Sequence, residues 1–108
     1  MATYSNTSYA SRNVGTSPVV VVSSIASGTV AISSLIVANT TTSPITADVY
    51  ITRSAANYYL VKTATIPVGG SLEVIQGNRV VMIASDTLSV VSSAATSADV
   101  IISALTAV

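Results

Sequence analysis

The stretch that decides the fold runs from Ile45 to Lys62 and reads ITADVYITRSAANYYLVK. From Ile45 to Ile51 every second residue is apolar, and the residues between them are mostly polar. This period of two predicts a β-strand with one buried face. From Tyr58 onward the stretch is rich in aromatic and β-branched residues, which favour a second strand. The short segment 54–57 between them predicts a β-hairpin at the centre of an antiparallel sheet.

The rest of the chain predicts more strands of the same kind. Apolar, β-branched segments recur at a spacing of about ten residues, separated by Gly, Pro, Asn or Asp. Connections this short join antiparallel strands, because parallel neighbours need a crossover of about a dozen residues or more. The alternation in segment 29–38 changes parity at Ser33-Ser34, which indicates a β-bulge or a crossing between sheets. We therefore expect an all-β protein of about eight strands, an antiparallel, jelly-roll-like β-sandwich.

Two parts are expected in the chain, an extended N-terminal arm at residues 1–17 and a β-sandwich domain at 18–108. Residues 1–17 are mostly polar and show no sustained period, so alone they would be disordered. Such an arm gains order by lying across a partner, and aromatic and Arg side chains are enriched at interface hot spots. The predicted interface residues come from the arm and from the first strand of the sandwich: Tyr4, Tyr9, Arg12, Val19 and Val21.

The composition restricts the partners of this protein. Charged residues make up 7% of the chain and the formal net charge is zero, whereas an ordinary soluble domain has about a quarter charged residues. Without a basic patch, neither nucleic acid nor an anionic membrane is an expected partner. The uncharged segment 19–38 has the length of a membrane span, but its Ser, Thr and β-branched residues favour two strands with a turn at 26–28. Because so little charge repels a second copy, we expect neighbours to cover much of the surface, in preference to a surface kept wet by Ser and Thr.

Few residue types in this chain are suited to catalysis. It has no His and no Cys, which removes the commonest general base and the usual zinc ligands. The acidic residues are expected on wet strand faces or in turns, so neither a catalytic pair nor a calcium loop is predicted. We therefore expect no enzymatic activity, no cofactor and no metal site; the acidic residues in question are Asp48, Glu73, Asp86 and Asp99.

The tyrosines of the central hairpin allow two interpretations. Tyr50 has the outward parity, and Tyr58 or Tyr59 should join it from the neighbouring strand. Together they could form a platform on which a sugar stacks, with Tyr50 and Tyr58 as ligand-stacking residues. A cross-strand aromatic pair that stabilises the sheet is the alternative, and we favour it.

Four segments of the chain follow one another in a characteristic order: Tyr58 to Lys62, Ile66 to Leu72, Ala84 to Val90 and Asp99 to Ser103. This order resembles that of small β-sandwich virion proteins of tailed bacteriophages. In those proteins a "yylv" strand is followed by an "ipaGgsl" turn, a "GDtl" turn and a closing "vdvivs" strand. The likeness covers about Ile45 to Leu105, and it departs from the pattern at Ser85, where Gly is expected.

The resemblance implies a non-enzymatic virion protein that works as a repeated copy. We expect a capsid decoration or cement protein on the capsid surface, a homotrimer that contacts the major capsid protein or other virion proteins. Such a protein stabilises the head by burying surface that the free subunits leave exposed. A neck, tail or fibre-base component is the alternative within the virion. A carbohydrate-binding β-sandwich module is the alternative of another class.

Overall fold

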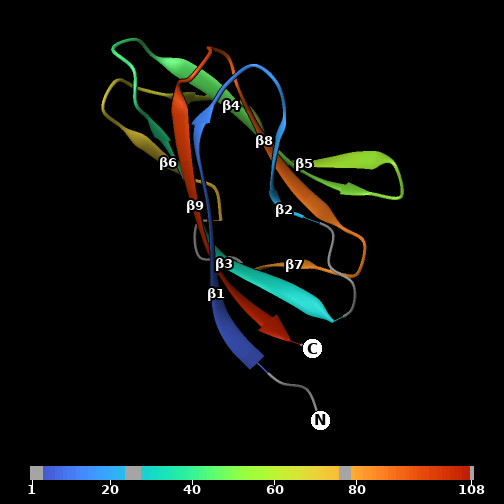
Figure 1. The fold of residues 1–108 in the computed structure, drawn as a ribbon. Coiled ribbons are helices and arrows are strands. Elements are labelled where there is room, and N and C mark those ends of the chain that lie inside the picture. Colours follow the sequence, from blue (N-terminus) through green and yellow to red (C-terminus); the bar gives the residue numbers. More distant parts are fainter. Residues whose placement is uncertain (1–3, 24–27, 76–78, 108) are drawn as a thin grey trace.

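The computed structural model describes residues 4–23, 28–75 and 79–107. In these ranges the chain forms nine β-strands, and no helix is long and apolar enough to cross a membrane. The strands build two antiparallel sheets that stack as a sandwich, which confirms the expected fold class (Figure 1). In chain order they are β1 (Tyr4–Val14), β2 (Val19–Val22), β3 (Thr29–Asn39), β4 (Ile45–Arg53), β5 (Ala56–Ile66), β6 (Ser71–Glu73), β7 (Val80–Met82), β8 (Thr87–Ser92) and β9 (Ala98–Ala107).

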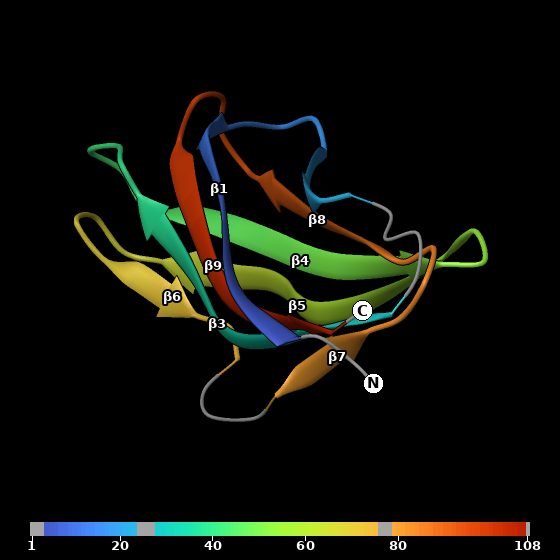
Figure 2. The same ribbon diagram turned by 60° about the horizontal axis from the view of Figure 1, so that its bottom comes forward.

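The strand order is that of a jelly roll. Sheet A has the order β1-β9-β3-β6, with β7 also paired to β3, and sheet B has the order β2-β8-β4-β5. Within the described ranges, β4 and β5 are the only consecutive strands that form a hairpin in one sheet. β6 and β7 both pair with β3, and every other pair of consecutive strands is divided between the two sheets (Figure 2). Since β6 lies opposite residues 36–38 and β7 opposite 30–32, two short strands share one position. We expected about eight strands, all of them after residue 17, and the ninth is β1.

The N-terminal residues differ from the expected arm. Tyr4–Val14 forms β1, which pairs with β9 from Tyr4 opposite Ala107 to Val14 opposite Ala98, with a bulge between Ser11 and Val14. The start of β1 and the end of β9 therefore lie side by side (Figures 1 and 2). The polar sequence is compatible with this position because an edge strand has one neighbour and one wet face. In the described residues, backbone pairing with β9 orders this segment.

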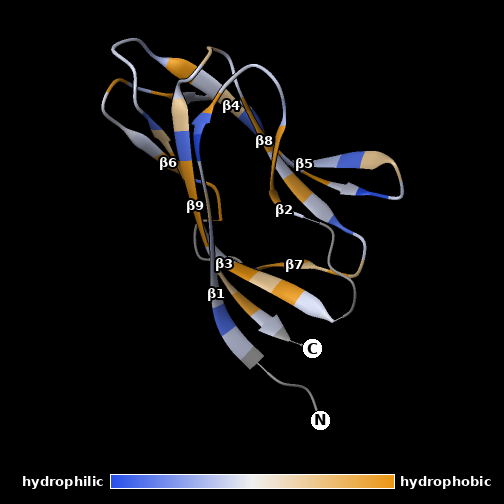
Figure 3. Cartoon of the chain, in the orientation of Figure 1, coloured by the Kyte–Doolittle hydropathy of each residue, from blue (hydrophilic) through white to orange (hydrophobic). Residues whose placement is uncertain are grey.

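The core forms where the two sheets face each other. All four apolar residues of the deciding stretch, from Ile45 to Ile51, are buried, as the alternation predicts. The bulge predicted at Ser33-Ser34 is also confirmed, because the register between β3 and β9 shifts between Ile32 and Ser34. Buried residues lie at even positions before the shift and at odd positions after it, and Figure 3 shows the alternation of hydrophobic and paler residues along β3. The uncharged segment 19–38 forms β2 and most of β3; the expected turn there falls largely on residues 24–27, outside the described ranges.

The central hairpin has a tighter turn than the predicted segment 54–57. Arg53 pairs with Ala56, which leaves a loop of Ser54 and Ala55 alone. Both residues have positive φ, 52° and 64°. This is the backbone of a type I′ turn, which favours Asn-Gly because other residues are strained there.

Replacing Ser54 by Asn together with Ala55 by Gly should therefore stabilise the protein. We expect the free energy of unfolding to rise by about 1 kcal/mol, since both replacements relieve left-handed strain. Chemical denaturation measures this change. Ala55→Val is the matched control and should act in the opposite direction, because a β-branched residue is strained most at positive φ. Equal stability of the two variants would contradict the assignment of the turn.

Candidate functional site

The outer face of sheet A exposes aliphatic side chains on neighbouring strands. Strand pairing aligns Ala10, Ile101, Ile36 and Glu73 in one row across β1, β9, β3 and β6. Ile101 is 52% exposed and Ile36 is 37% exposed. Four residues further along β9, a second row across the sheet contains two more exposed aliphatic side chains, Leu105 on β9 and Val81 on β7. A solvated sheet face normally presents polar residues at such positions, so this face is the candidate interaction surface.

A shallow hollow of about 490 Å³ lies in this face. Its floor includes Ile36, Ala38 and Ile101, and the charged residues Arg12 and Asp99 also line it. The Asp99 carboxylate accepts a hydrogen bond from the backbone N–H of Asn13 at 3.1 Å. Arg12 forms no salt bridge with any residue that the structure describes. The hollow is mainly apolar with a charged side, which suits a protein surface better than a small anion.

The predicted interface residues lie in different places. Arg12 is exposed on the outer face of sheet A, whereas Tyr9, Val19 and Val21 are partly buried and pack against the core. Tyr4 lies at the start of β1, opposite Ala107. Packing between the sheets therefore occupies three of the five residues that we expected at an interface. Their parity explains this, because the inward positions of edge strands also help to close the sandwich.

The exposed aliphatic residues of sheet A were not predicted, although the sequence carries a signal for them. In β9 the inward positions Val100 and Ile102 are apolar, and the outward positions Ile101 and Leu105 are apolar as well. A strand with one wet face would alternate between apolar and polar residues. Apolar residues on both parities of a strand that lacks a second covering layer indicate a face that another molecule covers.

The tyrosines of the hairpin form a cross-strand pair, as we favoured. Tyr50 lies opposite Tyr59, with ring centroids 5.1 Å apart and a tilt of 48° between the rings. The ammonium group of Lys62 lies 4.6 Å from the centroid of the Tyr59 ring. Tyr58 is opposite Ile51 instead and is 59% exposed, so the structure does not bring Tyr50 and Tyr58 together. Tyr50 is only 9% exposed, although its parity points outward, because its neighbours cover it.

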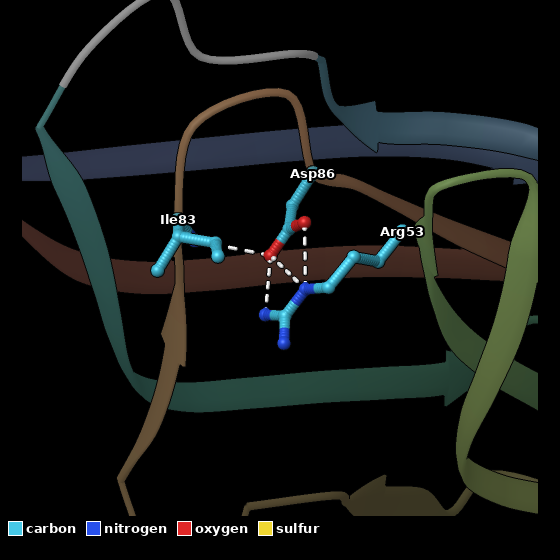
Figure 4. Close-up of polar contacts among 3 residues, drawn as sticks. All are labelled: Arg53, Ile83 and Asp86. Carbon is cyan, nitrogen blue, oxygen red and sulfur yellow. Dashed lines mark hydrogen bonds and ion pairs between the residues drawn. The ribbon is translucent and has the colours of Figure 1, made fainter.

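Asp86 is buried in an ion pair, although we expected it to be an ordinary turn residue. Arg53 donates to its carboxylate from Nη2 at 2.6 Å and from Nε at 2.9 Å, and the backbone N–H of Ile83 donates at 3.0 Å (Figure 4). The hydrogen bonds from Arg53 hold the pKa of Asp86 below its usual value; burial opposes this shift, and the Ile83 N–H adds to it. The same contact raises the pKa of Arg53. A permanently charged pair of this kind links the β4–β5 hairpin to the β7–β8 turn and is unsuited to proton transfer.

The remaining acidic residues each accept hydrogen bonds from nearby groups. Asp48 accepts from the backbone N–H of Thr63 at 2.6 Å and lies 3.5 Å from the Lys62 ammonium group. Glu73 accepts from the Ser34 hydroxyl at 3.3 Å. Within the described ranges, no group of three His, Cys, Asp or Glu residues could hold a metal ion. These carboxylates therefore serve the fold locally.

Asn39 fixes the loops at one end of the sandwich. Its Nδ2 donates to the carbonyl oxygens of Ser43 at 2.8 Å, Ile66 at 3.2 Å and Pro67 at 3.3 Å. Its Oδ1 accepts from the backbone N–H and the hydroxyl of Thr41, at 2.9 and 2.8 Å. The side chain is 6% exposed. This amide therefore connects two loops that are distant in sequence.

Comparisons with known proteins support the fold. No protein-family model matches this sequence, and no curated protein matches it. The resemblance to tailed-phage virion proteins stays a prediction. Among solved structures, a chain of a Bacillus endospore appendage, described as belonging to a family of disulfide-linked pili, matches with a TM-score of 0.57 and 13% sequence identity. The match covers 97% of this chain and 87% of that chain, and at this identity it shows a shared fold and nothing further.

Proposed function

We propose that this protein is a non-enzymatic structural subunit that works as one of many copies in a larger assembly. The observation that supports this proposal is the outer face of sheet A, where Ile36, Ile101, Leu105 and Val81 are exposed. Burying apolar surface contributes about 25 cal/mol per Å², so a neighbour that covers this face gains stability. With 7% charged residues and no net charge, the chain offers little repulsion against such packing.

The form of the assembly that the sequence favours is a tailed-phage virion. There the protein acts as a decoration or cement protein on the capsid surface, as a trimer in contact with the major capsid protein. A position in the neck, tail or fibre base is the second possibility. The Bacillus appendage with a similar fold is a pilus, which supports the wider proposal of a building block in an extended assembly. Since this sequence has no cysteine, its own assembly would depend on non-covalent contacts.

The carbohydrate-binding alternative has less support. Stacking on a sugar needs an open aromatic face. Tyr50 is covered and Tyr59 is engaged by Tyr50 and Lys62. Tyr58 is exposed but has no aromatic partner on its side of the hairpin among the described residues. Glycan-array binding that Tyr58→Ala abolishes would restore this alternative.

Localising the protein on particles tests the proposed function. We expect cryo-electron microscopy of virions to find copies of this fold spread over the head, and heads that lack the protein to burst at a lower temperature. A single ring of copies below the head would favour the neck or tail instead. A structural role would be refuted if the purified protein turned over a substrate and the protein were also absent from every particle fraction.

A further inference from the structure

Opposite charges lie at the two edges of the outer face of sheet A. Arg12 is on β1 at one edge and Glu73 is on β6 at the other, and the exposed Ile101 and Ile36 lie on the strands between them. Three strand spacings, about 14 Å, separate β1 from β6. The two charged positions are therefore equidistant from the boundary between β9 and β3.

Neither charge is neutralised within the described part of the chain. Arg12 and Glu73 form no salt bridge there. The Glu73 carboxylate accepts from the Ser34 hydroxyl at 3.3 Å and from the Leu35 N–H at 3.4 Å, both long hydrogen bonds between a charged and a neutral group. A cation from outside the chain could therefore approach Glu73, and an anion could approach Arg12.

We propose that a second copy of this chain stacks on the outer face of sheet A, with a two-fold axis that runs parallel to the strands above the β9–β3 boundary. This rotation places β1 of one copy over β6 of the other, and β9 over β3. Ile101 of each copy then packs on Ile36 of the other, and Arg12 of each copy faces the edge that carries Glu73 of the other. The proposal rests on the proposed function and identifies one contact by which the copies associate.

The geometry of the strands permits both contacts. Arg12 lies two residues along β1 from Ala10, which shares a row with Glu73. That offset is about 7 Å along the strand, a distance that an extended arginine side chain spans. A two-fold axis that runs across the strands would instead place β1 over β1 and β6 over β6, so that each charged edge meets an edge of the same sign. Charge complementarity therefore selects the axis parallel to the strands, across which identical surfaces meet.

The available area is sufficient for a specific contact. A face four strands wide and about 30 Å long offers about 600 Å² in projection. A standard interface buries roughly 800 Å² of accessible surface per partner, and accessible area exceeds projected area. The hollow of about 490 Å³ beside Ile36 and Ile101 gives room for aliphatic side chains of the second copy.

Sedimentation velocity of the purified full chain, from about 1 μM to about 1 mM, tests this proposal, since that range covers weak and moderate association. Ile101→Glu should weaken self-association at least about tenfold, because the carboxylate enters an apolar contact twice per dimer. Val68→Glu is the matched control, since Val68 is 53% exposed and Ile101 is 52% exposed, but Val68 lies outside sheet A. Circular dichroism and thermal unfolding show whether each variant is folded.

A charge exchange tests the two-fold arrangement itself. Arg12→Glu and Glu73→Arg should each weaken association, and the double variant should restore it to within about threefold of the original chain. Self-association that none of these variants affects overturns this inference and leaves the proposed function standing, with another surface in use. A chain that stays monomeric over the whole concentration range overturns the inference as well. The proposed function is refuted by a different result, heads that burst at the same temperature with and without the protein.

Discussion

Replacing Asn39 by aspartate should lower the free energy of unfolding by about 4 kcal/mol at neutral pH, although the two side chains have nearly the same shape. The Nδ2 group that donates to the carbonyls of Ser43, Ile66 and Pro67 becomes a carboxylate oxygen, which can only accept. The three carbonyl oxygens then lose their donor and face a buried negative charge instead. Burying such a charge without a donor costs several kcal/mol. Urea denaturation of the two proteins measures the difference.

The effect of Asn39→Asp should also depend on pH. Burial and the surrounding carbonyl oxygens raise the pKa of the new carboxyl group, because both disfavour its charged form. Below the pKa of an unfolded aspartate, about 3.9, the carboxyl group is protonated in both states and the variant regains part of its stability. The loss should therefore grow as the pH rises from about 4 to 7.

Asn57→Asp is the matched control for this prediction. Asn57 is exposed on β5, and its Oδ1 accepts a hydrogen bond from the Thr52 hydroxyl at 2.8 Å. A carboxylate accepts the same bond, so this variant should lose less than about 0.5 kcal/mol. If both substitutions have equally small effects, Asn39 does not hold the loops together.

Asn39 illustrates which features of this fold could not be predicted from the sequence. The alternation from Ile45 to Ile51 and the parity change at Ser33-Ser34 are local signals, and both identified the structure correctly. The contacts of Asn39 with Ile66, and of Arg53 with Asp86, join residues that are 27 and 33 positions apart. No periodicity encodes such pairs, since they depend on how the loops meet after the sheets have formed.

The edge strand β1 was missed for a different reason. Its sequence is polar, and hydrophobic periodicity is the main signal for a strand. Tyr9 and Val14 are the only large side chains that it packs toward the core among its described side chains, and a bulge lies between Ser11 and Val14. An edge strand of this kind is specified mainly by backbone hydrogen bonds to β9, which are available to almost any sequence. The exposed residues of β9, in contrast, carried a readable signal in their parity.

Replacing Asp86 by asparagine should lower the free energy of unfolding by about 3 kcal/mol at neutral pH. The carboxylate is fully buried and accepts hydrogen bonds from both the Arg53 side chain and the Ile83 N–H. An amide offers one acceptor oxygen in place of two, so one buried donor loses its partner. The Arg53 side chain is 43% exposed, so water screens much of the Coulomb attraction, and most of the loss comes from the buried hydrogen bonds.

The pH dependence gives the second signature of this ion pair. Because the pKa of Asp86 is lower in the folded protein than in the unfolded chain, its contribution to stability is complete above the unfolded value of about 3.9. The contribution is lost as the pH falls from there through the folded pKa. The difference in stability between the original chain and Asp86→Asn should therefore be constant from pH 5 to 7 and shrink below about pH 4.

Asp99→Asn separates this effect from a general response of carboxylates. Asp99 lies on the outer face of sheet A, partly exposed, and accepts one hydrogen bond, from the Asn13 N–H. An amide oxygen accepts that bond equally well, so the loss should stay below about 1 kcal/mol. If Asp86→Asn and Asp99→Asn lose the same stability at every pH, the buried ion pair contributes nothing specific. The link between the β4–β5 hairpin and the β7–β8 turn would then depend on apolar packing alone.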